Sequence, residues 1–294
     1  MQFEIPLSKF KGPFNLSRTI ASEQCPSDFW TKGEKYVTFA EVDNDWIRIE
    51  VVPNRDSLLV EATKPKAVKN LLLYQFWAEY DLDEFYNEFS DDKYISKAIN
   101  ACEGLRVMRD LNPEQMFLRA LLTQNSSVRQ IRKMQDLIMK HYGEKVNGFY
   151  SFPKPKTLAK IDKTELEEKC KVGYRAEYIL NAARLLANGE LNLNELRKLE
   201  TSEARRILTK INGIGPKVAD IILLYALGKP DTFPMDVWLR RALIREYFDG
   251  KKVSDQKLRE FTLSYFGNHA GFAHLYMWSF ERKLNKMIPI KSLR

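Results

Sequence analysis

The sequence predicts an α+β protein in which a small antiparallel sheet precedes a mostly helical body. Two observations support this fold class. Over residues 36–62, β-branched and aromatic residues alternate with polar ones, as in strands with one wet face. After residue 67 the apolar spacing changes to every third or fourth residue, as in helices. We therefore divide the chain into an N-terminal antiparallel sheet domain, residues 1–80, and a helical body, residues 81–294.

Three strands are predicted in the first domain. Residues 36–42 and 46–52 alternate on either side of the turn-forming triplet Asp43-Asn44-Asp45, which predicts a β-hairpin. Residues 58–62 are rich in Leu and Val and form the third predicted strand.

The helical segments follow in order, separated by short connections that carry Pro, Gly and Asn. The predicted helices are residues 68–80, 91–102, 113–123, 128–142, 163–170, 176–186, 193–198, 202–210, 216–227, 237–247, 254–266 and 270–282.

Composition restricts the function only weakly. The 47 Lys and Arg residues exceed the 39 Asp and Glu residues, giving a net charge of +8, which suits a polyanionic partner but is not specific for one. Cys25, Cys102 and Cys170 are too far apart for a CxxC pair and too few for a four-thiolate iron–sulfur cluster. We expect inert thiols in a reducing compartment. Because no segment resembles a signal peptide or a membrane span, we expect an intracellular protein that binds no membrane.

Residues 202–228 carry the most specific signal, a helix, a tight turn and a second helix. Two glycines in the turn permit backbone angles that other residues avoid, and they allow close approach to a ligand. The free N–H groups at the start of the second helix form an anion site, which suits a DNA phosphate. This pattern predicts a helix-hairpin-helix motif; an ordinary helix corner that needs glycine is the alternative. The candidate phosphate-binding residues are Gly213, Ile214, Gly215 and Lys217.

Two residues are candidates for catalysis. Lys217 lies in the first turn of the second helix, where the helix dipole disfavours a cation. A neutral amine can attack C1′ of a nucleotide and form a Schiff base. Asp236 lies at the start of a later predicted helix, where it can cap that helix and where its carboxylate can stabilise an oxocarbenium-like sugar. The alternatives are a solvated lysine and a purely structural cap.

The Gly-Ile-Gly turn, Lys217 and the sequence Pro234-Met-Asp236 together resemble the helix-hairpin-helix glycosylase superfamily. Lys217-Val-Ala-Asp220 is similar to the 8-oxoguanine DNA glycosylase/AP lyase family in particular. Alkylation-repair relatives usually lack the lysine, and the endonuclease III-like branch usually carries a four-cysteine cluster. The resemblance implies a monomeric base excision repair enzyme that acts on damaged double-stranded DNA. The resemblance also implies that the enzyme requires no metal or redox cofactor, although the family's hairpin often holds a monovalent cation through backbone carbonyls.

The resemblance also implies residues that hold the DNA after the damaged base leaves the helix. Asn125 would contact the orphaned partner base, Tyr174 would wedge into the gap, and Arg175 would hydrogen-bond the orphaned base. Gln130 stands where the family usually has a second arginine, which weakens the expected preference for cytosine opposite the lesion.

Three further residues are implied for the pocket of the damaged base. His274 would read the Watson–Crick edge, where the family commonly has an amide, and Trp278 would stack on the base. Glu23 stands where the family often brings a glycine carbonyl to the base. The expected lesion is an oxidised purine, 8-oxoguanine opposite cytosine.

Three other functions remain open from the residues alone. The first is a monofunctional glycosylase for alkylated or deaminated bases, against which Lys217 argues. The second is a non-catalytic helix-hairpin-helix module that binds phosphates. The third is an unrelated α+β protein with a chance Gly-Ile-Gly, which would show no salt-dependent affinity for DNA.

Overall fold

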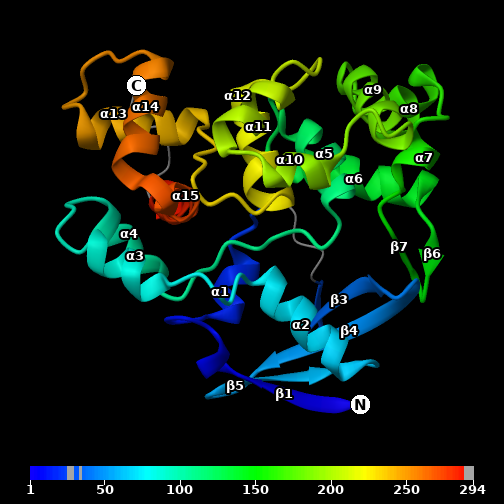
Figure 1. The fold of residues 1–294 in the computed structure, drawn as a ribbon, viewed down its shortest axis with the longest axis horizontal. Helices are drawn as coiled ribbons and strands as arrows, with labels where there is room; N and C mark the ends of the chain where they lie inside the picture. The colour runs from blue at the N-terminus through cyan, green and yellow to red at the C-terminus, as the bar shows by residue number, and fades with distance from the viewer. Residues whose placement is uncertain (25–29, 33–34, 288–294) are drawn as a thin grey trace. The chain divides into compact units, whose positions relative to one another are not determined.

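The computed structural model describes residues 1–24, 30–32 and 35–287, and it contains two compact units (Figure 1). The first unit, here called the sheet unit, consists of Met1–Arg109 and the chain from Pro230 onward. The second, Asp110–Lys229, is called the hairpin unit because it contains the predicted helix-hairpin-helix. The expected class, an antiparallel sheet followed by a mostly helical body, is confirmed. The compact units do not follow the division at residue 80, because the last helices of the chain belong to the same unit as the sheet.

Strands β1 to β5 form a five-stranded antiparallel sheet with the order β1-β5-β4-β3-β2. The predicted strands correspond to β3, β4 and β5, whereas β1 and β2 were not predicted. Strand β1 pairs along its whole length with β5, with Ile5 opposite Leu58, so its place depends on a partner far along the chain. The strands are β1 (Gln2–Pro6), β2 (Trp30–Lys32), β3 (Lys35–Val42), β4 (Asp45–Pro53) and β5 (Ser57–Glu61).

The predicted hairpin between β3 and β4 is confirmed with a tighter turn. Val42 pairs with Asp45, so the turn consists of Asp43 and Asn44 alone. Both have positive φ angles, 52° and 65°, as a two-residue hairpin turn of type I′ requires. Asp and Asn tolerate this conformation better than most residues, which explains why they stand there.

The sheet unit also contains helices from both ends of the chain. The short helices α1 and α3 were not predicted, although Asn15 and Asp81 cap them with side-chain oxygens. Helix α15 contacts α4, α13 and α14 and is the buried centre of this group. The helices are α1 (Leu16–Ala21), α2 (Pro65–Gln75), α3 (Leu82–Glu88), α4 (Ile95–Cys102), α13 (Val237–Tyr247), α14 (Asp255–Phe266) and α15 (Ala270–Met287).

The hairpin unit is helical apart from one small ribbon. Helices α6, α8 and α10 have the predicted bounds, whereas α7 and the ribbon were not predicted. Helix α12 continues as a buried π-helical turn over Ile222–Ala226. The elements are α5 (Pro113–Ala120), α6 (Val128–Tyr142), β6 (Lys145–Val146), β7 (Phe149–Tyr150), α7 (Pro155–Leu158), α8 (Lys163–Cys170), α9 (Arg175–Ala187), α10 (Leu193–Lys198), α11 (Thr201–Leu208) and α12 (Pro216–Ile221).

A buried arginine organises the N-terminal segments of the sheet unit. Arg106 is fully buried, and its guanidinium donates hydrogen bonds to the carbonyl oxygens of Trp77, at 2.8 Å, and Tyr80, at 3.1 Å. Burial lowers the pKa of Arg106 to about 10. Backbone carbonyls therefore satisfy this charge inside the unit, as a buried polar group requires.

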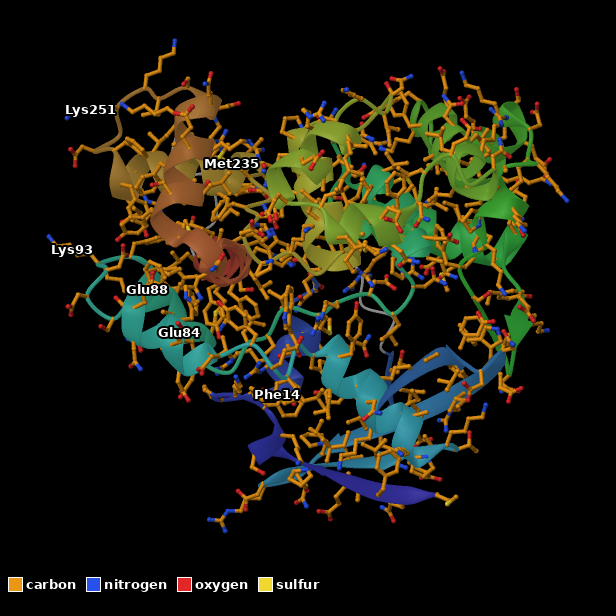
Figure 2. All side chains as sticks on the ribbon, viewed as in Figure 1. Phe14, Glu84, Glu88, Lys93, Met235 and Lys251 are labelled. Carbon is orange, nitrogen blue, oxygen red and sulfur yellow. The ribbon has the colours of Figure 1, made fainter. Side chains whose placement is uncertain are left out.

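Exposed charged residues include Glu84, Lys93 and Lys251. Lys93 and Lys251 project into solvent, as Figure 2 shows. Within the described part of the chain, no helix is both long enough and apolar enough to cross a membrane.

Candidate nucleic-acid interface and active site

The predicted helix-hairpin-helix is formed by α11 and α12, and its turn needs glycine at one position. Gly213 has a φ of +86°, and a Cβ built on it would lie 2.3 Å from Cγ of Tyr178. Any side chain would therefore both strain the backbone and collide with the ring. Ile214 is buried and anchors the turn in the core of the hairpin unit.

Gly215 differs from Gly213 in every respect. Its φ is −83°, it is exposed, and a Cβ built on it would meet no atom within 4 Å. Neither backbone strain nor internal packing explains glycine here. Gly215 is the N-cap of α12, where exposed N–H groups and open space suit an approaching anion.

A buried ion pair joins the two helices of the hairpin. Nε of Arg205 on α11 lies 2.7 Å from Oδ1 of Asp220 on α12, and Asp220 is fully buried. Removing one partner of such a pair typically costs about 3–5 kcal/mol. Asp220 was noted only as part of the family resemblance, and Arg205 was missed. Arg205 lies one turn before the end of α11, and nothing in the local sequence indicates that it pairs with a residue of the next helix.

Lys217 follows the turn in the first turn of α12 and is partly exposed. Its Nζ lies 3.4 Å from the carbonyl oxygen of Thr123, which ends the helical turn after α5. The amine is thus held beside residues 123–125, the segment that carries Asn125.

The three residues expected at the orphaned base lie together in the hairpin unit. Nδ2 of Asn125 donates a hydrogen bond of 3.3 Å to the hydroxyl oxygen of Tyr174. The guanidinium carbon of Arg175 lies 4.6 Å from the centre of the Tyr174 ring, and Nε donates to the carbonyl oxygen of Gln124 at 3.0 Å. Tyr174 is 49% exposed, unusual for so large an apolar ring, so it can reach a partner.

Gln130, which replaces the family's second arginine, has a structural partner. Its Oε1 accepts hydrogen bonds from the backbone N of Ser127, at 2.8 Å, and from Oγ of Ser127, at 2.9 Å. Ser127 in turn caps α6, so the two residues form a capping box. The Gln130 carbonyl is therefore committed to the helix end.

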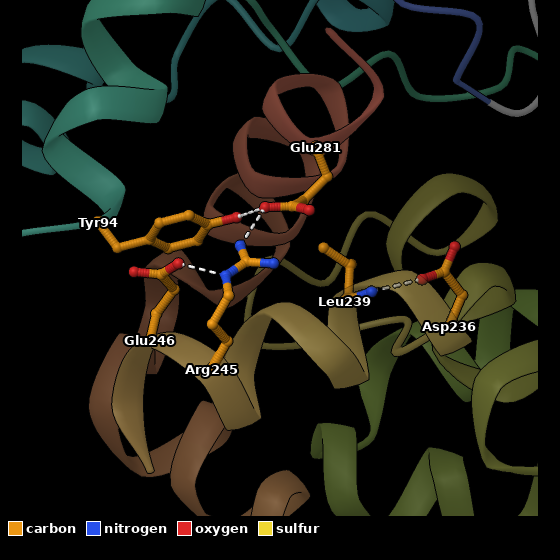
Figure 3. A network of polar contacts seen from close by, with 6 residues as sticks. All are labelled: Tyr94, Asp236, Leu239, Arg245, Glu246 and Glu281. Atoms are coloured by element: carbon orange, nitrogen blue, oxygen red, sulfur yellow. Dashed lines mark hydrogen bonds and ion pairs between the residues drawn. The ribbon is translucent and has the colours of Figure 1, made fainter. Parts of the chain in front are cut away.

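Asp236 is the N-cap of α13 in the sheet unit, as the sequence indicated. Its Oδ1 accepts a hydrogen bond of 2.8 Å from the backbone N of Leu239 (Figure 3). The side chain is partly exposed. The carboxylate is thus held in one orientation by the helix that follows it.

The other end of α13 is attached to α15 by a polar network (Figure 3). Arg245 donates to Oε1 of the buried Glu281 at 2.7 Å, and the same oxygen accepts from the Tyr94 hydroxyl. Burial and Glu281 raise the pKa of Tyr94 well above its usual value. The C-terminal end of α13 is thereby attached to α15.

His274 and Trp278 lie one turn apart on α15, and an unpredicted residue joins Trp278 to Glu23. His274 is 8% exposed and edge-on to Phe233, with ring centres 5.6 Å apart. The guanidinium carbon of Arg282 lies 4.5 Å from the centre of the Trp278 ring. Nη2 of Arg282 forms an ion pair with the Glu23 carboxylate. In the sequence, the i, i+4 spacing of Trp278 and Arg282 could have indicated that these two side chains lie side by side on one helix.

The Glu23 segment is held by its neighbour Gln24. Gln24 is buried, donates to the Arg106 carbonyl oxygen at 2.9 Å and accepts from the Met108 N–H at 2.8 Å. Glu23 itself has a φ of 56°, the left-handed conformation that glycine adopts most easily. A glutamate here keeps the backbone shape that a glycine would provide.

The described cysteines are buried free thiols. Cys102 and Cys170 are buried, and desolvation raises the pKa of both thiols, that of Cys170 to about 11. Cys25 lies outside the described residues. Over residues 1–24, 30–32 and 35–287, no three His, Cys, Asp or Glu side chains are grouped as a metal site would need.

A helix-hairpin-helix with a glycine turn, a lysine in its second helix and a capping aspartate after it defines a class of DNA-repair proteins. Residues 118–266 match the HhH-GPD superfamily of base excision DNA repair proteins, and the chain belongs to that superfamily. Within it, the chain is similar over most of its length to proteins named as glycosylase/lyases. A protein of Methanothermobacter thermautotrophicus named "probable N-glycosylase/DNA lyase" is 30% identical, covering 92% of this chain and 95% of the relative.

The chain is also similar to a solved 8-oxoguanine glycosylase/lyase and to a DNA-3-methyladenine glycosylase. The Clostridium acetobutylicum 8-oxoguanine glycosylase/lyase, solved with double-stranded DNA containing cytosine opposite 8-oxoguanine, has a TM-score of 0.84. It is 28% identical, and the match covers 93% of each chain. A DNA-3-methyladenine glycosylase of Bacillus subtilis is 26% identical, covering 69% of this chain and 70% of the relative.

Proposed function

We propose that this protein is a bifunctional DNA N-glycosylase/AP lyase that removes 8-oxoguanine opposite cytosine from double-stranded DNA. The observation that carries the proposal is Lys217, an amine in the first turn of the hairpin's second helix, 3.4 Å from the Thr123 carbonyl. A non-catalytic helix-hairpin-helix module does not need this lysine, and neither does a glycosylase that uses water as its nucleophile. We propose further that the enzyme is a monomer and that it acts on DNA inside the cell.

The chemistry assigns one role to each of two side chains. The lone pair on Nζ of Lys217 attacks C1′ while the C1′–N9 bond breaks, and the base leaves with the bonding electrons and takes up a proton. The Asp236 carboxylate balances the positive charge that develops on the sugar. The C1′–O4′ bond of the adduct then breaks, a proton passes from the nitrogen to O4′, and a protonated Schiff base remains. Loss of a C2′ proton expels the 3′ phosphate, which nicks the strand on the 3′ side of the lesion.

The DNA contacts use the exposed residues of the hairpin unit. The turn around Gly215 binds a backbone phosphate, and Tyr174 enters the space that the flipped base vacates. A base stacked on an aromatic ring is worth about 1–3 kcal/mol, which offsets part of the cost of flipping. Asn125 and Arg175 contact the orphaned base. The reaction needs no metal or redox cofactor, and hairpin carbonyls can hold a monovalent cation.

The pocket of the damaged base uses residues of the sheet unit. Trp278 provides the stacking surface, His274 reads the base edge, and the Glu23 backbone carbonyl accepts a hydrogen bond from the lesion. The left-handed φ of Glu23 supports the match to the family's glycine, because glycine adopts this conformation more easily than any other residue.

A second candidate is a monofunctional glycosylase for alkylated bases. The similarity to the Bacillus subtilis DNA-3-methyladenine glycosylase favours it. A panel of duplexes with oxidised, alkylated and deaminated bases separates the two candidates, because only the Schiff-base enzyme leaves a nicked strand. Binding without cleavage of any lesion would instead indicate a non-catalytic module.

Borohydride trapping tests the proposal. The protein is incubated with duplex DNA carrying 8-oxoguanine opposite cytosine, and borohydride reduces any Schiff base to a permanent crosslink. We expect a crosslink with the wild type and with Lys198→Gln, which changes an exposed lysine of α10, but none with Lys217→Gln. No wild-type crosslink would refute this pairing of nucleophile and lesion.

A further inference from the structure

The Arg282 guanidinium already occupies part of the surface expected to receive the damaged base. Trp278 and Arg282 lie one turn apart on α15, and the guanidinium carbon is 4.5 Å from the centre of the indole ring. At this distance the cation interacts with the electron-rich face of the ring. Any base that stacks on Trp278 therefore meets a fixed positive charge at the edge of its site.

Glu23 also holds this charge in position. Nη2 of Arg282 pairs with the Glu23 carboxylate, and Nη1 lies 3.4 Å from the Ser22 carbonyl oxygen. The two side chains are each about one third exposed, at 30% and 29%. The buried Gln24 holds the same loop in place, so the carboxylate cannot follow the arginine freely.

The charge of the base distinguishes two classes of damaged purine. 8-Oxoguanine in DNA is neutral, whereas 7-methylguanine and 3-methyladenine carry a formal positive charge while they are attached to the sugar. A cationic base on Trp278 would compete with Arg282 for the same ring face and would be repelled by it. A neutral base also shares the ring face with Arg282, but the positive charge does not repel it, so the repulsion is what separates the two classes.

We propose that Arg282, held over Trp278 by Glu23, is a specificity-determining residue that favours neutral oxidised purines over cationic alkylated purines. This inference rests on the proposed function, because it assumes that the damaged base stacks on Trp278. It assigns the selectivity to an ion pair and a cation–π contact rather than to the shape of the pocket.

The experiment compares two lesions in one duplex sequence, 7-methylguanine and 8-oxoguanine, each opposite cytosine. Single-turnover excision is measured for the wild type, Arg282→Met, Arg282→Lys and Glu23→Gln, and the readout is the ratio of the 7-methylguanine rate to the 8-oxoguanine rate. Arg282→Met is expected to raise this ratio at least about tenfold, because it removes the positive charge over the ring. Glu23→Gln is expected to lower it, because the guanidinium keeps its full charge.

Arg282→Lys is the matched control, since it retains a cation of similar length, and its ratio should stay nearer the wild type than that of Arg282→Met. An equal ratio in the wild type, Arg282→Met and Glu23→Gln would overturn the inference. If Arg282→Met does not fold, the ratio still decides the inference: it should fall in Glu23→Gln and stay near the wild type in Arg282→Lys, and an unchanged ratio in Glu23→Gln would overturn the inference. A wild type that forms no borohydride crosslink on 8-oxoguanine would refute the proposed function instead, so the two failures are distinguishable.

Discussion

The ring of Tyr178 packs directly against the α-carbon of Gly213, so that a Cβ on this glycine would lie 2.3 Å from the ring. The same ring is edge-on to Tyr174, with ring centres 6.0 Å apart. One side chain of α9 therefore contacts both the hairpin turn and the exposed tyrosine. The surface proposed to bind phosphate and the residue proposed to enter the DNA share a rigid support.

The two turn glycines should respond differently to alanine. Gly213→Ala places a methyl group into the Tyr178 ring at a φ of +86°, and should lower the free energy of unfolding by about 2–4 kcal/mol. Gly215→Ala has free space and an ordinary φ, so its unfolding free energy should change by less than about 1 kcal/mol. Its affinity for DNA should nevertheless fall. Urea unfolding and fluorescence anisotropy measure the two effects, and unchanged DNA affinity in Gly215→Ala would contradict the phosphate site.

Truncation of Tyr174 should weaken binding to lesion DNA. Tyr174→Ala removes the exposed ring and should raise the dissociation constant by about 5- to 150-fold, corresponding to a loss of about 1–3 kcal/mol of stacking. Tyr174→Phe keeps the ring and loses only the hydrogen bond from Asn125, so it should bind nearly as well as the wild type. Equal affinity for wild type and Tyr174→Ala would show that this ring does not enter the DNA.

Substitution of Asp236 can separate its structural role from its charge. Asp236→Asn keeps an oxygen that accepts the Leu239 N–H, so stability should be retained while excision slows on the order of 10²-fold. Asp236→Ala also loses the helix cap and should cost about 1 kcal/mol of stability. Single-turnover kinetics and thermal unfolding on the same samples provide the test. Full activity in Asp236→Asn would leave Asp236 as a structural cap.

Gln130 offers a test of how the opposite base is selected. Its carbonyl is engaged with Ser127, so it should contribute little to reading that base, and excision should depend only modestly on cytosine. Gln130→Arg should increase the preference for cytosine by about tenfold or more, because arginine can donate two hydrogen bonds to a base edge. Excision rates opposite each of the four bases measure this, and the capping box predicts a small loss of stability. An unchanged preference would mean that residue 130 does not reach the opposite base.

Much of the secondary structure was predictable because its signals are local. Ser127, Asp162 and Asn192 each precede a helix whose bounds were predicted, and each caps that helix with its side chain. The Gly-Ile-Gly turn and its lysine are likewise contiguous. By contrast, β1 is assigned only by its pairing with β5, which lies far along the chain.

The sequence by itself determined the fold class, the helix-hairpin-helix and the candidate residues Lys217 and Asp236, because neighbouring residues encode helix caps, turns and periodicity. Only the tertiary structure decided the contacts of Tyr178 with Gly213 and of Arg282 with Trp278 and Glu23. Glu23 and Arg282 are joined by the fold across most of the chain length. Such contacts depend on the path of the backbone, and no local pattern records which distant side chains that path brings together.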